Sequence, residues 1–318
     1  MAKPLFIELD DGRETHKLPI IYEDRAIMAI DKPAGWMLVP FSWQSTGRNL
    51  QAALTSSIAA GDFWAQSRNL KFLRFIHRLD ADTTGILLLA KSMGAVDSYG
   101  ELFESRKMEK TYLAVVEGIP REKEWTCRLK LGQVPGEPGK MQIDAREGKD
   151  AETYFRVLDK RGGRALVEAH PKTGRTHQIR VHLASAGCPV VGDKLYSKQP
   201  FPPGSRKMGD FTLALRSVAL EFDDPFNRRP VQIRADATPF LDAFGFGKNV
   251  PAPAPAATTV APGAVAPPPR PAPVARPPVP AKPPFKPRPP ARPMNRRPQS
   301  PGAHPQKPSN PRHDRRRP

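Results

Sequence analysis

Cysteine is scarce in this chain of 318 residues, and long apolar runs are missing. The two cysteines, Cys127 and Cys188, stand far apart, so neither a disulfide framework nor metal-ligand spacing exists and a reducing compartment is expected. The apolar run 86–90 is as long as any in the chain and far too short to cross a bilayer. The first residues lack the apolar core of a signal peptide. We therefore expect a cytoplasmic protein without a membrane partner.

Acidic and aromatic residues are almost missing from the last part of the chain. From Val250 to Pro318 there is one acid, Asp314, and one aromatic, Phe285, beside 24 of the 39 prolines. Such a segment has too little apolar bulk to offset the entropy of ordering itself. We expect residues 248–318 to form a disordered tail rich in Pro, Ala, Arg and Lys.

The tail also carries much of the positive charge. Its 13 Lys and Arg less one acid give +12, which leaves +6 of the formal +18 for the rest of the chain. A charge of this size attracts RNA or any other polyanion in a salt-dependent way. A solvated, solubilising extension is the other interpretation, and the sequence does not separate the two.

Hydrophobic patterning predicts more strands than helices. Strands are expected at 20–22, 26–30, 86–90, 111–118, 153–158 and 165–169, and within 211–222 and 231–235, with helices at 48–60, 93–106, 175–186 and 239–244. Gly61 and Gly187 should end the first and third helices, and Thr173 should cap the third. Several hairpins favour an α+β domain with a largely antiparallel sheet.

A carboxylate, Asp80, stands between basic residues and a small-residue turn. It ends the stretch Phe75-Ile76-His77-Arg78-Leu79-Asp80, and the turn Asp82-Thr83-Thr84-Gly85 follows. A carboxylate at a strand end can point into a cleft and attack an electrophilic carbon, as in retaining sugar chemistry. The same window fits a turn-forming aspartate that caps Thr83 or Thr84, and taken alone it favours that interpretation.

Two further windows hold candidate binding residues. Lys172 to His182 reads KTGRTHQIRVH, where a basic helix start would offer N–H groups and charge to a phosphate. An ordinary solvated helix face is the alternative. Tyr112 is either a packing residue of a strand or a stacking face for a base. His177 and His182 have no His-Glu-x-x-His or Cys-x-x-Cys motif beside them, which argues against a metal site and excludes a zinc-dependent base deaminase.

Taken together and in this order, the windows resemble the RluA-type family of RNA pseudouridine synthases. The resemblance covers about residues 21–222 and is far more specific than any single window. The family patterns are Val/Ile-Asp-Lys-Pro-x-Gly at 30–35, His-Arg-Leu-Asp-x-x-Thr-Ser/Thr-Gly at 77–85, Lys-x-Tyr-x-Ala at 110–114, Gly-Arg-x-His-Gln-Ile-Arg-x-His at 174–182 and Gly-Asp-x-x-Tyr at 192–196.

The resemblance implies an enzyme that isomerises specific uridines of structured ribosomal or transfer RNA to pseudouridine, without a cofactor or metal. It implies the pseudouridine synthase fold, an α+β domain whose mixed, mostly antiparallel sheet forms two lobes flanking a basic catalytic cleft. Residues 21–247 are expected to form this catalytic domain. The N-terminal extension, residues 1–20, is too short for the S4-type RNA-binding domain that many relatives carry. A monomer is the simpler expectation.

The family's functional residues carry over position by position. Asp80 matches the nucleophilic aspartate, Tyr112 the tyrosine that packs against the target base and is a candidate general base, and Arg180 the basic partner of the carboxylate. Arg78 matches an arginine that fills the gap left by a flipped nucleotide. The further residues expected to bind substrate are His77, Lys110, Arg175, His177 and Gln178.

The chain departs from the family pattern in the loop after Gly35. Members often carry His-Pro there, whereas this chain reads Leu38-Val39-Pro40-Phe41-Ser42-Trp43, so we leave that loop out of the site. The alternative function is a non-catalytic RNA-binding or ribosome-assembly factor that uses the same cleft and tail. The carboxylate favours the enzyme, because a negative charge facing RNA weakens phosphate binding and serves no purpose in a pure binder.

Overall fold

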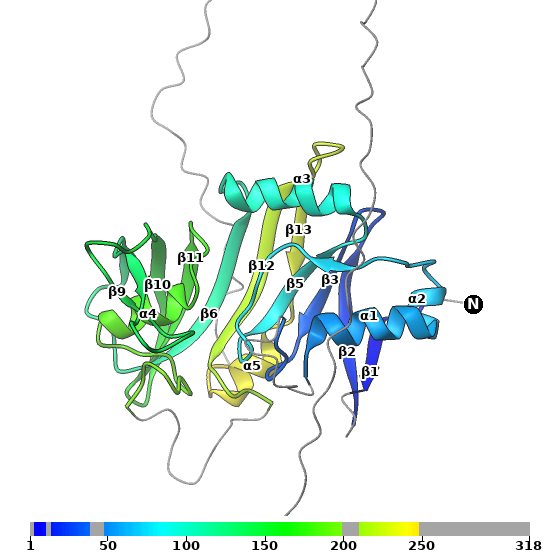
Figure 1. The fold of residues 1–318 in the computed structure, drawn as a ribbon. Helices are drawn as coiled ribbons and strands as arrows, with labels where there is room; N and C mark the ends of the chain where they lie inside the picture. Colours follow the sequence, from blue (N-terminus) through cyan, green and yellow to red (C-terminus); the bar gives the residue numbers. More distant parts are fainter. Residues whose placement is uncertain (1–2, 11–13, 39–47, 199–209, 248–318) are drawn as a thin grey trace, which may run out of the picture. The chain divides into compact units, whose positions relative to one another are not determined.

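The computed structural model describes residues 3–10, 14–38, 48–198 and 210–247, which are built around one large sheet. The strands are β1 (Phe6–Asp10), β2 (Thr15–Glu23), β3 (Ile27–Lys32), β4 (Arg74–Phe75), β5 (Thr84–Ala90), β6 (Glu109–Glu117), β7 (Glu124–Cys127), β8 (Leu131–Gln133), β9 (Met141–Ile143), β10 (Thr153–Arg161), β11 (Arg164–Pro171), β12 (Leu215–Asp223) and β13 (Pro230–Arg234). Eleven of these strands pair in the order β1-β2-β3-β5-β12-β6-β11-β10-β7, with β13 beside β12 and β4 beside β5 (Figure 1). The remaining two, β8 and β9, pair with each other.

One junction in the sheet is parallel, and all other described strand pairs run antiparallel. The parallel neighbours are β5 and β12, which share two register pairs, Thr84 with Arg216 and Gly85 with Ser217. This junction divides the sheet into a first half (β1 to β5) and a second half (β6, β7 and β10 to β13). The predicted α+β class with a mixed, mostly antiparallel sheet is confirmed.

The helices differ in which half of the sheet they contact, and the helix Met93–Glu104 packs across the junction, against both β5 and β12. The helices are α1 (Leu50–Ala60), α2 (Phe63–Gln66), α3 (Met93–Glu104), α4 (Gln178–Ser185) and α5 (Thr238–Ala243). Helices α1 and α2 contact β1 in the first half, whereas α4 packs on β10 and β11 in the second half and on β9 of the separate β8–β9 pair, as Figure 1 shows. The side chain of Asn49 caps the start of α1, and Gly61, with φ at 75°, ends it as predicted.

Strand β5 lies between two apolar layers, and all seven of its residues are buried. Leu87 and Leu89 join the larger core, which also contains Trp36 and Trp64. Ile86 and every second residue after it in β5 point to the opposite face of the sheet, where they pack in a cluster with Tyr99 of α3. A strand covered on both faces reads as a continuous apolar run, which explains why residues 86–90 were readily predicted.

Residues near the N-terminus belong to the sheet. Residues 1–20 were predicted to be an extension outside the domain, yet β1 pairs with β2 and β2 pairs with β3. Ile7, Leu9 and Leu18 are buried in the larger core. The boundary predicted at residue 20 therefore falls inside β2.

Helix α4 begins later than predicted. It was expected from residue 175 with Thr173 as its cap, but it starts at Gln178 after His177, whose φ of 54° is left-handed. The residues from Lys172 to Thr176 instead form a non-helical segment that leads into the helix. They can therefore face a cleft rather than lie on a helix surface.

Gly85 marks the tightest approach in the parallel junction, and Gly85→Ala is expected to be strongly destabilising. Its φ is 101°, and an added Cβ would lie 2.0 Å from the carbonyl oxygen of Ser217. We expect the free energy of unfolding in urea to fall by about 3 kcal/mol or more. Gly136→Ala is the matched control, because Gly136 has a φ of 77° and no atom within 4 Å of its added Cβ. That variant should lose only about 1 kcal/mol, and equal losses would contradict the role of the close approach.

The predicted tail, residues 248–318, and the loop departure at 39–43 lie outside the described residues. Of the helices in the described ranges, none is both long enough and apolar enough to span a membrane.

Candidate active site

A cleft of about 950 Å³ gathers most of the residues that the sequence motifs singled out. Its walls come from the loop before β5, the start of β6, the segment before α4 and the connection between β8 and β9. Seven cationic side chains line it, Arg78, Arg106, Lys110, Lys140, Arg175, Arg180 and Lys194, against four acidic ones, Asp80, Asp82, Glu104 and Glu137. The cleft is therefore basic, as expected.

A buried lysine, Lys32, binds the backbone of the loop that carries Asp80. Its Nζ donates to the backbone carbonyls of Pro33 at 2.9 Å, Ala81 at 2.7 Å and Thr83 at 3.0 Å. Three acceptors use all three N–H bonds of an ammonium group. Burial lowers the pKa of Lys32 to about 7, and nearby carboxylates oppose that shift. Lys32 thus fixes the backbone directly after Asp80.

Asp80 forms an ion pair with Arg180 of α4, with 2.9 Å between Oδ2 and Nη1. The opposite edge of the guanidinium binds Asp193 twice, with Nε to Oδ2 at 2.7 Å and Nη2 to Oδ1 at 2.9 Å. Asp193 is fully buried, and its Oδ1 also accepts the backbone N–H groups of Leu195 and Tyr196. A two-point pairing fixes the plane of the guanidinium. Arg180 is therefore held in place by Asp193 and presents its remaining edge to Asp80.

Arg180 remains charged in spite of its burial. Burial by itself would lower the pKa of Arg180, but the hydrogen bonds of Asp193 and the charge of Asp80 outweigh it and raise that pKa above its usual value. A permanent cation beside a carboxylate favours the ionised carboxylate. The pair therefore supplies a negatively charged oxygen at the floor of a basic cleft.

The two oxygens of Asp80 differ in their surroundings. Oδ2 faces Arg180 and lies 3.8 Å from Nε2 of His177. Oδ1 accepts no hydrogen bond from the residues that the structure describes. The side chain is 25% exposed, so the carboxylate is in contact with the cleft. One oxygen is anchored and the other is open to a bound molecule.

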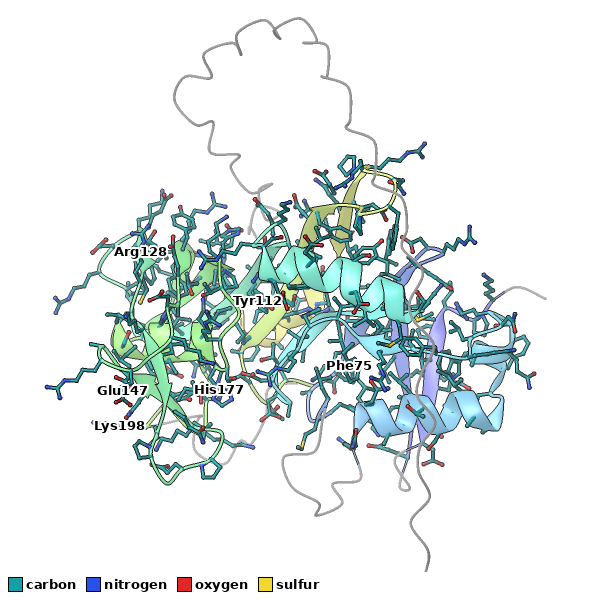
Figure 2. The ribbon with its side chains drawn as sticks, turned by 45° about the horizontal axis from the view of Figure 1, so that its top comes forward. Phe75, Tyr112, Arg128, Glu147, His177 and Lys198 are labelled. Carbon is teal, nitrogen blue, oxygen red and sulfur yellow. The ribbon has the colours of Figure 1, made fainter. Side chains whose placement is uncertain are left out.

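Tyr112 lies on β6 and lines the same cleft. Figure 2 shows Tyr112 and His177 on the side of the second half of the sheet, with Phe75 of β4 across from them in the first half. The side chain of Tyr112 is buried, and this burial raises its pKa to about 12. Tyr112 is therefore a neutral phenol at pH 7 that lines the cleft.

Arg78, in the loop before β5, and Lys110, on β6, bring positive charge to the cleft. Arg78 is exposed and donates from Nη2 to the hydroxyl of Thr176 at 3.1 Å. Lys110 donates to the carbonyl of Thr173 at 3.2 Å, and burial together with the charge of Lys172 lowers its pKa to about 8. Both side chains thus contact the segment before α4, where phosphate oxygens could replace part of these contacts.

Gln178 uses its whole amide inside the protein. Oε1 accepts from Thr173 Oγ1 at 2.6 Å and from the N–H of Arg175 at 3.0 Å. Nε2 donates to the carbonyl of Glu152 and to Thr153 Oγ1, both at 2.9 Å. An amide has no further donor hydrogen and no further strong acceptor site. Gln178 therefore shapes the segment before α4, and direct binding of substrate by it stays a prediction.

His77 and Arg175 are also engaged within the protein. Nε2 of His77 accepts the backbone N–H of Leu88 at 3.1 Å, and its ring stacks on Phe103 with 4.8 Å between centroids. Burial lowers the pKa of His77 to about 3, so the ring is neutral. Arg175 donates from Nε to the carbonyl of Asp150 at 2.9 Å. Both residues line the cleft. Direct binding of substrate by either of them stays a prediction.

Sequence reasoning gave no role to Lys32, Asp193 or the Asp31–Arg216 pair. Asp31, next to Lys32, binds Arg216 of β12 through both oxygens, at 3.0 and 2.6 Å. The sequence shows only that these charged residues stand within or near the motifs. Their roles depend on ion-pair partners 13 to 185 residues away in the chain, which the spacing of the motifs does not reveal.

The described residues contain no group of three or more His, Cys, Asp or Glu side chains placed to hold a metal ion. The two histidines of the segment before and within α4 have other partners. Nδ1 of His177 lies 2.8 Å from the hydroxyl of Tyr196, and His182 is bonded to Thr153 and to the carbonyl of Leu129.

Comparison with known proteins agrees with this geometry. Residues 26–185, half of the chain, match the family model described as RNA pseudouridylate synthase. The ribosomal large subunit pseudouridine synthase C of Yersinia pestis is 34% identical over 222 residues, which cover 68% of this chain and 64% of the relative. An uncharacterized RNA pseudouridine synthase of Synechocystis is 35% identical over 204 residues, 64% of this chain and 60% of the relative. The chain thus spans less than two thirds of the length of these relatives.

Solved structures show the same fold. The human RNA pseudouridylate synthase domain containing 1 superposes with a TM-score of 0.54 at 27% identity, over 70% of this chain and 84% of that one. The human domain containing 4 gives a TM-score of 0.55 at 24% identity, over 72% of this chain and 92% of that one. The family expected from the motifs is confirmed, and this chain belongs to the RNA pseudouridylate synthases.

Proposed function

We propose that this protein isomerises specific uridines in structured RNA to pseudouridine, with Asp80 as the nucleophile. The observation that carries the proposal is the arrangement of Asp80, whose Oδ2 is held by Arg180 at 2.9 Å while Oδ1 is open to a basic cleft. A pure RNA binder gains nothing from an ionised carboxylate at the floor of such a cleft, because it repels phosphate. A nucleophile needs this placement.

The reaction is an isomerisation and balances without a co-reactant. The N1–C1′ bond of uridine breaks, uracil turns in the pocket, C5 bonds to C1′, and the proton on C5 is lost as N1 gains one. Asp80 either attacks C1′ directly, forming an ester that C5 displaces, or assists loss of a proton from the ribose to give a glycal. In both routes the anchored pair of Asp80 and Arg180 supplies an aimed, ionised oxygen.

Tyr112 is proposed as the face on which the flipped uracil packs. Extrusion of a base costs about a few kcal/mol, and stacking on an aromatic ring offsets part of it. Because Tyr112 is a neutral phenol in the free protein, it can remove the C5 proton only by passing its own proton on. Arg78, exposed at the cleft mouth, is proposed to fill the gap in the RNA, and Lys110 to contact phosphate.

The substrate is proposed to be ribosomal or transfer RNA, modified by a monomer in the cytoplasm. The name of the Yersinia relative, a ribosomal large subunit pseudouridine synthase, supports ribosomal RNA, and the free thiols of Cys127 and Cys188 fit a reducing compartment. Pseudouridine mapping of total RNA from cells with and without this protein tests the proposal. Loss of one or a few modified positions is expected. An unchanged map, together with a growth or ribosome-assembly defect, would instead support the non-catalytic alternative.

The basic tail is proposed to add a sequence-independent attraction to RNA. Residues 250–318 carry 13 Lys and Arg against one acid. A chain ending at Gly247 should therefore bind RNA more weakly, with a shallower slope of log affinity against log salt concentration. Filter binding across a salt series measures that slope. The control keeps the length of the tail and replaces its Lys and Arg by Gln, and it should behave like the truncation. A slope equal to that of the full chain would rule the tail out as an RNA contact.

A further inference from the structure

The hydroxyl of Tyr196 connects the β8–β9 pair to the active site. It accepts the backbone N–H of Met141 at 2.8 Å and lies 2.8 Å from Nδ1 of His177. The described residues offer no other partner for this hydroxyl. The guanidinium of Arg180 also lies over the ring of Tyr196, with 5.2 Å between its carbon Cζ and the ring centroid. Tyr196 is therefore fixed on three sides.

These contacts and the charge of Asp80 together determine which nitrogen of His177 carries the proton. The oxygen of Tyr196 accepts the N–H of Met141 and keeps a second lone pair, so by itself the hydroxyl can either donate to Nδ1 of His177 or accept from it. The carboxylate of Asp80 lies on the other side of the ring, and its negative charge near Nε2 favours a hydrogen on that nitrogen. Burial lowers the pKa of His177, so the neutral ring prevails at pH 7. A neutral imidazole whose Nδ1 accepts carries its hydrogen on Nε2. Asp80 thus favours the Nε2–H tautomer, and the hydroxyl of Tyr196 completes it by donating to Nδ1.

Nε2 of His177 faces Asp80. It lies 3.8 Å from Oδ2, the same oxygen that Arg180 binds at 2.9 Å. This separation is longer than a hydrogen bond and closes with a shift of about 1 Å. The backbone of His177 is held in a left-handed conformation, φ 54°, which non-glycine residues rarely adopt. His177 directly precedes α4, and this backbone conformation places its ring near the carboxylate of Asp80.

We infer that His177 is a positioning residue that presents Nε2–H to Oδ2 of Asp80, and that the hydroxyl of Tyr196 stabilises this tautomer by donating to Nδ1. With two donors on Oδ2, the carboxylate cannot rotate, and Oδ1 alone faces the sugar carbon of a bound uridine. The inference rests on the proposed role of Asp80 as the nucleophile. It assigns His177 a function different from direct binding of RNA.

The first test reads the tautomer directly and needs no activity. Long-range ¹H–¹⁵N spectra of the full-length protein at neutral pH distinguish the Nε2–H, Nδ1–H and doubly protonated rings. The His177 signals are those that vanish in His177→Asn. We expect the Nε2–H form in the parent protein and a mixture of both tautomers in Tyr196→Phe. An Nδ1–H ring or an imidazolium in the parent protein would overturn the inference, whether or not the protein makes pseudouridine.

The second test uses two amide substitutions of different reach. Asn tolerates the left-handed backbone and places its amide near Nδ1, so His177→Asn keeps the contact with Tyr196 and loses the one with Asp80. Gln places its amide nitrogen near Nε2. We expect kcat to fall roughly ten- to a hundredfold in His177→Asn, the range of a hydrogen bond to a charged group. In His177→Gln, kcat should be several-fold higher than in His177→Asn, with KM for RNA unchanged in both.

Equal kcat values in the Asn and Gln variants would overturn the inference, as would a rise in KM without a fall in kcat, which belongs to an RNA contact. Circular dichroism and thermal unfolding of each variant show whether it folds. If the parent protein forms no pseudouridine on any RNA, the proposed function fails while the tautomer measurement still decides the geometry around His177.

Discussion

Asp80→Asn is expected to lower kcat for pseudouridine formation by about 10⁴-fold or more, the scale of removing a covalent nucleophile. An amide oxygen is a poor nucleophile. The substitution also removes the ion pair with Arg180, whose Nη1 lies 2.9 Å from Oδ2 of Asp80 in the parent protein. RNA binding should persist or tighten, because a negative charge disappears from a basic cleft. Release of tritium from RNA labelled at C5 of uridine measures turnover, and filter binding measures affinity.

The neighbouring carboxylate of Asp82 provides the matched control. It lines the same cleft and accepts a hydrogen bond from Thr212 at 2.8 Å, but does not contact Arg180. Asp82→Asn makes the same change of charge two residues away and should keep kcat within about tenfold, since the amide oxygen can still accept the hydrogen bond of Thr212 and the contact with Arg180 is not touched. If both variants lose activity equally, the effect is one of cleft charge. If Asp80→Asn remains active, the proposed mechanism is wrong.

Arg180→Met is expected to damage both stability and turnover. It leaves Asp193, which is fully buried, without its cation, and a broken buried pair typically costs about 3 kcal/mol or more. Asp80 loses its anchor as well, so kcat should fall by about 10²-fold or more through misorientation alone. Urea unfolding measures the first effect. Single-turnover kinetics on folded protein measures the second.

A second substitution separates the two effects of Arg180→Met. Asp193→Asn keeps an oxygen for the N–H groups of Leu195 and Tyr196 and removes the unpaired charge. The double variant should therefore recover part of the lost stability, a non-additive result expected for residues in contact. Turnover should stay low, because Asp80 still lacks its partner. Full recovery of turnover in the double variant would show that Arg180 acts only through stability.

The elements that were predicted correctly have strong local patterns. Strand β5 is apolar throughout, and α3 repeats apolar residues at helical intervals. Strand β1, with the sequence FIELD, alternates so that only Ile7 and Leu9 are buried, and it was missed. The start of α4 was misplaced because His177 adopts a left-handed backbone before the helix, and its ring contacts Tyr196, 19 residues away, which the local sequence does not reveal.

The joint order of the motifs predicted which residues share the cleft, and single windows did not. Asp80 alone favoured a turn-forming role, and the backbone N–H of Thr83 does donate to the carbonyl of Asp80, but the side-chain hydroxyls of Thr83 and Thr84 are buried without a partner among the described residues. Its ionic partner is 100 residues away. Which residues support Asp80 from below, such as Lys32, could be seen only once the chain was folded, because backbone carbonyls have no sequence signature.

The Asp31–Arg216 pair has a consequence for how the protein is made. Its two residues are 185 positions apart, and the pair adjoins Lys32, which holds the Asp80 loop. During synthesis the first half of the sheet can be complete long before β12 leaves the ribosome, at about 5–20 residues per second. Until then the junction between β5 and β12 does not exist, and long-range pairing of this kind folds slowly. A nascent or truncated chain ending before residue 216 should therefore lack the assembled cleft.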